Sequence, residues 1–183
     1  MQKKLDISVG NLLPLFKNKE EILIEIFIRY LDVVFKEVKS LNYEKDEIFL
    51  LKEFLLDNLE ADIKYRFLHL ELNLLVLTFP KFKKIMQEQI QNEIIMIKKL
   101  VLHQIKNGYI KPLDENELDF FISNSWIITT SNLSFWNLIE DDILKNTKKG
   151  SLNMYYFLKP YLTQKSFENE EIRSIENILK VQL

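Results

Sequence analysis

The sequence predicts an all-α protein, and three observations carry that prediction. Of its 183 residues, 47% are hydrophobic, while only 3 are glycine and 4 are proline. Leu, Ile, Lys and Glu are abundant, which is typical of helical globular chains and not of disordered ones. Apolar residues recur at intervals of three and four along most of the chain, and capping residues separate these stretches. A chain of this length can bury a core as one domain with a small appendage.

The N-terminal stretch, residues 5–22, has the form of the second half of a helix-turn-helix. A short apolar turn carries Ser8, which can cap a helix, and Gly10, and a Phe-x-Asn-Lys-x-Glu junction beginning at Phe16 then leads into a long helix. The charge supports this interpretation. Residues 1–19 hold four lysines against Asp6, four minus one or +3, whereas the whole chain carries a formal charge of −2. A basic N-terminal segment on a near-neutral body fits DNA binding.

This stretch resembles the DNA-binding segment of the TetR/AcrR family of bacterial transcriptional regulators. In that family the turn and recognition helix run as Ser-x-Gly-[Asn/Thr]-Leu-Tyr-Tyr-His-Phe-x-[Asn/Ser]-Lys-[Glu/Asp]-Glu-[Ile/Leu]. The resemblance implies a TetR-like fold, in which residues 1–18 are the remnant of a helix-turn-helix domain and residues 19–183 form a helical ligand-binding and dimerisation domain. Ten positions in fifteen match: Ser8, Gly10, Asn11, Leu12, Phe16, Asn18, Lys19, Glu20, Glu21 and Ile22.

The chain departs from the family pattern in two ways. Leu13, Pro14 and Leu15 replace the Tyr-Tyr-His segment that supplies phosphate and base contacts in the family, and Pro14 is expected to distort the recognition helix. The family also places a whole helix and most of a second before this point, whereas this chain begins at Met1. Either the start of the gene is assigned too late, or the chain is a truncated relative that cannot read DNA as the family does.

The first long helix is predicted to begin at a capping box formed by Asn18 and Glu21 and to run to residue 40. Its charges form one narrow stripe, so it is buried on most sides and is either a mechanical link or an ordinary core helix.

Residues 46–79 are predicted to be helical, with a division near residues 61–62. Residues 65–72 resemble a motif of one TetR subfamily. Pro80 is expected in the first turn of a helix that stops at Asn107 and Gly108.

The C-terminal third is predicted to hold the dimer interface. Asp114 and Glu117 form a capping box for a helix over residues 115–138, which carries aromatic and small polar residues but few charges. Residues 140–150 are expected to form a loop, residues 152–162 a helix, and Ser166 the cap of a last helix. In the family two such helices pair across a two-fold axis, so the resemblance implies a homodimer built on 115–138 and 152–162. The interface residues expected are Thr130, Trp136, Tyr155 and Tyr156.

Polar residues set among apolar ones indicate where a ligand could bind. The candidates for the pocket of a small, apolar effector are His69, Asn73, Asn124, Trp126 and Thr129. Two alternatives stay open: His69 as an ordinary surface or core histidine, and Trp126 as part of the dimer core. For DNA, Ser8 at the start of the recognition helix and Lys19 would hold phosphates, and Asn11 would reach a base or a phosphate.

These residues predict a ligand-responsive repressor that binds operator DNA as a homodimer and is released by a small-molecule effector. The alternative is a TetR-like dimeric ligand-binding or interaction module that no longer binds DNA.

The sequence argues against an enzyme, because His69 and His103 lie on separate predicted helices and no Gly-x-Ser-x-Gly motif, phosphate loop or helical pair of metal ligands occurs. With no cysteine, disulfides and zinc fingers are excluded, and no metal or cofactor is expected. A cytoplasmic protein without a signal peptide or membrane span is predicted.

Overall fold

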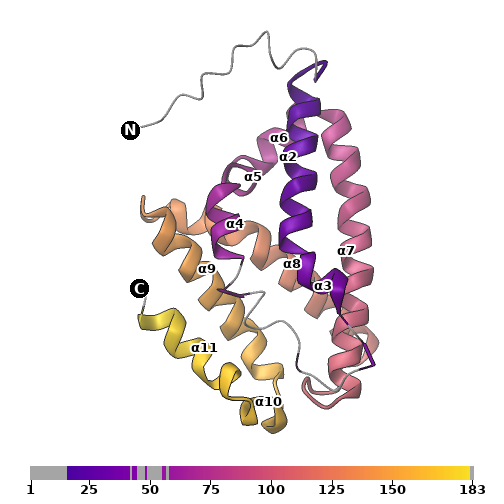
Figure 1. The fold of residues 1–183 in the computed structure, drawn as a ribbon, viewed down its shortest axis with the longest axis vertical. Helices are drawn as coiled ribbons and strands as arrows, with labels where there is room; N and C mark the ends of the chain where they lie inside the picture. Colours follow the sequence, from indigo (N-terminus) through magenta and orange to yellow (C-terminus); the bar gives the residue numbers. More distant parts are fainter. Residues whose placement is uncertain (1–15, 42, 45–47, 49–54, 57, 182–183) are drawn as a thin grey trace.

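The structure is a computed structural model that describes residues 16–41, 43, 44, 48, 55, 56 and 58–181. The expected all-α class is confirmed: the regular elements of the described residues are helices, with one isolated antiparallel bridge between Ile110 and Leu162. In chain order (Figure 1) they are α2 (Lys19–Val34), α3 (Lys36–Ser40), α4 (Leu59–Lys64), α5 (Phe67–Leu70), α6 (Leu72–Thr78), α7 (Pro80–Lys106), α8 (Glu115–Asn137), α9 (Ile143–Leu158), the 3₁₀ turn η2 (Lys159–Tyr161), α10 (Gln164–Glu168) and α11 (Glu170–Val181).

The helices form two packed groups. At one side α2 and α7 lie next to each other with their N-terminal ends together, and the short helices α4, α5 and α6 flank α2 (Figure 1). At the other side α8 and α9 pack against each other, and α9 also contacts α4 and α11. The longest helices therefore enclose the interior from three directions, α2 and α7 from one group and α8 from the other.

The start of α7 is capped by a side chain from α2. Phe79 at the N-cap position provides no side-chain hydrogen bond, and Pro80 at the first helical position has no N–H to donate. Glu20 fills this gap, because its Oε1 accepts hydrogen bonds from the backbone N–H of Lys81 at 2.6 Å and of Phe82 at 3.1 Å. A carboxylate at this position also complements the positive end of the helix dipole. The first turns of α2 and α7 are thus joined by a charged contact.

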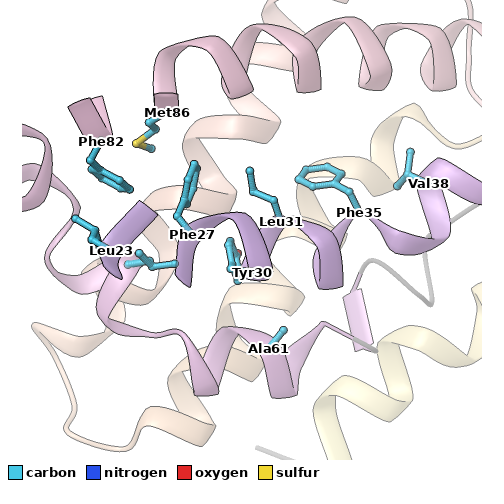
Figure 2. Packing of buried hydrophobic residues seen from close by; sticks show 10 residues of the cluster. Leu23, Phe27, Tyr30, Leu31, Phe35, Val38, Ala61, Phe82 and Met86 are labelled. Atoms are coloured by element: carbon cyan, nitrogen blue, oxygen red, sulfur yellow. The ribbon is translucent and has the colours of Figure 1, made fainter. Parts of the chain in front are cut away.

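The core between α2 and α7 is aromatic and aliphatic. Figure 2 shows Phe82 and Met86 directed from α7 toward α2, while Tyr30 on the other side of α2 faces Ala61 of α4. The rings of Phe27 and Phe82 meet edge to face with their centroids 5.3 Å apart, a favoured aromatic geometry. A second buried cluster joins α9 to α11, and a third joins the end of α7 to α8.

Two helix ends match their sequence signals closely. Gly108 has φ of 74°, and α7 closes on it with the backbone hydrogen bonds Tyr109 to Gln104 and Gly108 to Ile105, which is a Schellman motif. At the start of α8, Asp114 accepts from the N–H of Glu117 at 2.8 Å, and the Glu117 carboxylate accepts from the N–H of Asp114 at 2.9 Å. The predicted capping box is confirmed.

The first long helix differs from its prediction at both ends. The Asn18 side chain accepts from the N–H of Glu21 at 3.0 Å as expected, but the Glu21 carboxylate accepts from the N–H of Lys17 at 2.7 Å, one residue earlier than in a capping box. The helix also does not run unbroken to residue 40, because the backbone at Phe35 (φ −99°, ψ 10°) leaves helical geometry between α2 and α3.

The predicted division near residues 61–62 is wrong. These residues lie inside α4, and the breaks fall instead at Tyr65, with φ of −102°, and at Glu71, with φ of −109°. Neither break contains Gly or Pro, so no local sequence signal marks them. As a result, three short helices, α4, α5 and α6, occupy residues 59–78.

Most of the polar stretch 140–150, from Ile143 onward, is helix and not loop. Asp142 caps α9 by accepting from the N–H of Lys145 at 3.0 Å, and the helix ends at Leu158. Gly150 lies inside α9, where a Cβ atom would come within 3.2 Å of the Asn132 Cβ on α8. Its small size therefore serves the close approach of α8 and α9, and the Asn132 side chain donates to the Gly150 carbonyl at 3.2 Å.

Ser166 is not the cap of the last helix. Thr163 caps α10, and the Asn169 side chain accepts from the N–H of Ile172 at the start of α11. Ser166 is fully buried within α10 and donates its hydroxyl hydrogen to the Tyr109 carbonyl. It therefore ties α10 to the turn after α7.

The Glu20 cap gives a first testable prediction. Replacing Glu20 with Ala leaves two N–H donors at the start of α7 without their carboxylate, so we expect the free energy of unfolding to fall by roughly 1–2 kcal/mol. Urea denaturation at pH 7 measures the change. The control is Glu25→Ala, which breaks an exposed i,i+4 pair with Arg29 and should cost about 0.5 kcal/mol or less. Equal losses in the two variants would contradict the capping role.

Candidate ligand-binding site

A cavity of about 170 Å³ lies in the interior enclosed by α2, α7 and α8. Its wall is mostly apolar, with Val34 and Phe35 at the α2 end, Met86 and Val101 from α7, and Phe121 from α8. The described lining residues include no Lys, Arg, Asp or Glu. Such a cavity favours an apolar ligand, because a charged group placed there would lose its hydration without gaining a partner.

Several hydroxyl groups on α8 line the cavity but are already hydrogen-bonded within their own helix. Ser125 donates to the Phe121 carbonyl at 2.8 Å, Thr129 to the Ser125 carbonyl at 2.9 Å, and Thr130 to the Trp126 carbonyl at 2.9 Å. Bonding to the preceding turn satisfies a hydroxyl without a partner in the cavity. Because these hydroxyl groups are satisfied within α8, the cavity wall offers few free polar groups even though α8 has several polar residues.

Two residues of the cavity wall, Tyr30 and His69, form a polar cluster with Asp62, which does not line this cavity. The Tyr30 hydroxyl lies 3.1 Å from Asp62 Oδ1 and 3.0 Å from His69 Nε2. Tyr30 has one hydroxyl hydrogen, and the Asp62 carboxylate can only accept, so the consistent assignment is His69 Nε2–H to Tyr30 and Tyr30 O–H to Asp62. His69 is further fixed because its carbonyl accepts from the Ser134 hydroxyl at 2.8 Å. The cluster thus joins α2, α4, α5 and α8.

The environment of Tyr30 keeps its hydroxyl protonated. Burial raises the pKa of Tyr30 well above its ordinary value of 10.0, and the charge of the Asp62 carboxylate and its hydrogen bond raise it further. Tyr30 therefore remains a neutral donor throughout the physiological range.

Glu93 on α7 is a buried acidic residue. Its side chain is 5% exposed, and Oε2 has no hydrogen-bond partner among the described residues. Burial raises the pKa of Glu93 from 4.5 to about 7, while the charge of Lys39 on α3 opposes the shift. Glu93 is therefore a carboxyl group whose charge changes near neutral pH.

Comparison with known proteins decides the family. The sequence profile of the TetR family, described as "Bacterial transcriptional repressor", matches residues 29–169. The chain belongs to the TetR family of transcriptional regulators. A crystal structure of a TetR-family transcriptional regulator from Marinobacter aquaeolei VT8 has the same fold, with a TM-score of 0.74 and 23% identity over 97% of this chain and 84% of that one. No curated protein matches the sequence significantly.

Other classes of site are not seen in the described part of this TetR-family chain. There, no three His, Cys, Asp or Glu side chains lie together as metal ligands would. Over the same residues, none of the helices combines the length and the apolar character needed to cross a bilayer.

The structure places the predicted pocket residues in two environments. His69, Trp126 and Thr129 line the cavity. Asn73 on α6 and Asn124 on α8 are exposed and do not line it. Asn124 and Trp126 are two residues apart on a helix, so their side chains point in different directions.

The predicted dimer and DNA residues are also dispersed. Thr130 lines the cavity and Trp136 is half-buried, Tyr155 is buried in the core with 2% exposure, and Tyr156 is 42% exposed. Lys19 is exposed at the first residue of α2, whereas Ser8 and Asn11 lie outside the described residues. The structure therefore brings only part of the predicted interface set to the surface.

Sequence reasoning missed Tyr30 and Asp62. Tyr30 lies in an apolar stretch of α2 that was interpreted only as core, although a buried Tyr needs a partner for its hydroxyl and so points to a polar group nearby. Asp62 is 32 residues away and lies in a region whose helix boundaries were predicted wrongly, and no sequence signal pairs the two.

Glu93 gives a prediction on pH dependence. Because its folded-state pKa is raised from 4.5 to about 7, the folded protein holds a proton that the unfolded chain has released, and the free energy of unfolding falls as pH rises across this window. Glu93→Gln removes this loss. We expect the variant to match the wild type near pH 4.5 and to be more stable by roughly 1–3 kcal/mol at pH 8, at about 1.4 kcal/mol per pKa unit.

Urea denaturation at both pH values measures this difference. Glu88→Gln, an exposed substitution on the same helix, is the control and should follow the wild type at both. A Glu93→Gln curve that runs parallel to the wild type from pH 4.5 to 8 would contradict the prediction.

Proposed function

We propose that this TetR-family protein is a ligand-responsive repressor that binds operator DNA as a homodimer and releases it when a small, mainly apolar effector enters the cavity. The observation that carries the proposal is the position of α2. Its residues Phe27, Tyr30, Leu31 and Val34 line the cavity, and its first turn directly follows the segment that resembles a DNA reader. A ligand that displaces α2 would thereby move the reader.

The hydrogen bonds of Glu20 support this coupling between the cavity and the N-terminal segment. It fixes the start of α2 to the start of α7, and α7 contributes Met86, Ile97 and Val101 to the cavity wall. A shift of either helix on ligand binding is therefore carried to the same end of the molecule. Ligand and operator would then oppose each other's binding by one coupling free energy. DNA contact by Ser8, Asn11 and Lys19 and a cytoplasmic location are further parts of the proposal.

Two neighbouring valines on α2 allow a matched test of the effector site. Val34 lines the cavity, whereas Val33 is 50% exposed. Val34→Phe fills part of the cavity, and a Phe placed where room exists is tolerated better than one forced into a packed core. In a reporter fused to the promoter of the protein's own gene, we expect Val34→Phe to keep repression but to lose relief by effector. Val33→Phe should respond as the wild type does.

This experiment also separates the two candidate functions. Equal relief in both variants would contradict an effector site in the cavity. If the wild type leaves the reporter unrepressed and binds no promoter DNA in fluorescence anisotropy, while ligands still bind in the cavity, the alternative holds: a TetR-like ligand-binding or interaction module without DNA binding.

The proposed homodimer rests on an apolar stripe of α8 that faces away from the cavity. Phe120 is 70% exposed, Ile127 57%, Phe135 54% and Leu138 87%. Spacings of seven, eight and three residues keep these side chains on one side of the helix. An exposed apolar stripe of this length is typical of a surface that a second subunit covers.

Light scattering tests this interface. The mass of one chain is 22.0 kDa. We expect the wild type at about 10 µM to show twice this mass, because an interface of the size found in stable dimers holds two subunits together at this concentration. Ile127→Glu should give monomers, since it places a charge in the apolar contact. Leu77→Glu changes another apolar residue, 82% exposed on α6, and should remain dimeric. A monomeric wild type would contradict the proposal.

A further inference from the structure

A second, smaller cavity of about 60 Å³ adjoins the first. The two share five wall residues: Tyr30, Val34, His69, Thr129 and Met154. Only side chains therefore separate them, and a ligand lying in the larger cavity could extend a short group into the smaller one past Tyr30 and His69.

The smaller cavity is polar and offers hydrogen-bond acceptors. Asp62 lines it, 29% exposed, and a carboxylate only accepts. Asn146 also lines it, and its Nδ2 donates to the Glu140 carbonyl at 2.6 Å. Its Oδ1 is buried and finds no partner among the described residues, although a buried amide oxygen normally has one. Two acceptors thus border the space.

Most donors of this cavity are already engaged. The Thr147 hydroxyl donates to the Ile143 carbonyl at 2.7 Å, and Thr129 to the Ser125 carbonyl at 2.9 Å. The Asn132 amide donates to the Gly150 carbonyl and accepts from Asn153 at 2.8 Å. A ligand group that donates hydrogen bonds therefore fits better here than one that accepts them.

The charges point the same way. Among the described residues that line either cavity there is no Lys or Arg, and Asp62 is the acidic one. A carboxylate or phosphate on the ligand would face Asp62 with no Lys or Arg among these described residues to pair with, whereas an ammonium group would be stabilised by the Asp62 carboxylate.

We infer that the ligand is a small amphiphilic amine, with its apolar body in the larger cavity and its protonated amino group directed to Asp62 and Asn146 Oδ1 in the smaller one. This inference rests on the proposed function, in which the larger cavity is the effector site. The volume limits the body: a cavity of roughly 150 Å³ accepts benzene, and this one measures about 170 Å³. An ammonium group brings three donors, enough for both acceptors. Arylalkylamines of the size of 2-phenylethylamine match these limits.

Three probes that share one apolar body test the amine. The full chain is titrated by calorimetry at pH 7 with 2-phenylethylamine, the neutral 2-phenylethanol and the anionic 3-phenylpropionate. We expect the amine to bind at least about tenfold more tightly than the alcohol, and the anion more weakly than either, since hydrogen bonds to a charged group are the stronger ones. Equal affinities for amine and alcohol, or no binding of the amine, would overturn the inference.

Two Asp variants test the assigned contact. Asp62→Asn should weaken the amine about tenfold while leaving the alcohol within about twofold, because only the amine needs the charge. Asp32→Asn, which alters an exposed pair with Lys39, should change neither. Circular dichroism and thermal unfolding check that Asp62→Asn is folded; if it is not, the probe comparison on the wild type decides. An unchanged amine affinity in folded Asp62→Asn would overturn the contact.

The reporter described above distinguishes this inference from the proposed function. If the alcohol binds and relieves repression while the amine does not, the effector site stands and the amine is wrong. If the amine binds as expected but repression is unaffected, the ligand class stands and the regulatory role fails.

Discussion

The carboxylate of Glu20 at the start of α7 is the contact on which the arrangement of this protein depends. A helix that begins Phe-Pro has no cap of its own, and it receives one from α2, 61 residues earlier in the chain. This fixes α2 and α7 side by side with their N-terminal ends together, and their apolar faces then meet through Phe27 and Phe82. The cavity lies between these two helices and α8. Removing the cap would loosen the end of α2 that follows the basic N-terminal segment.

The composition of α8 explains how one helix can serve two surfaces. Its Ser and Thr residues donate to their own preceding turn, so they cost little in an apolar cavity wall. On the exposed face, the apolar residues Phe120, Ile127 and Phe135 stand among small polar residues, and few charged residues lie between them. The near absence of charge after Asp119 predicts a helix covered on more than one side, and cover on the second side stays a prediction. It could not tell which residues face inward, because that depends on the direction from which α2 and α7 approach.

Sequence reasoning succeeded where a signal and its effect lie within one turn of helix. The caps at Asn18 and Asp114, Pro80 at the start of α7 and Gly108 after its end all act on neighbouring backbone groups, and each was predicted correctly. It failed where long-range packing decides. The breaks in the region before α7 have no Gly or Pro. The polar stretch 140–150 was expected to be a loop, although Gly150 within it lies where α9 packs closely on α8. The triad of Tyr30, Asp62 and His69 joins three helices, so no spacing in the sequence reveals it.

The geometry also couples the proposed dimer to the proposed effector. Trp126, Thr129 and Thr130 face the cavity from α8, while Ile127 between them points to the exposed stripe. Because helices are stiff across their diameter, a ligand that displaces the cavity face of α8 must also displace the stripe. The partner subunit would then move relative to α2 without any change in the contacts of the first turn of α7. In the proposed dimer, the spacing between the two DNA-binding segments would depend on both displacements, so a small ligand in a single cavity would alter it.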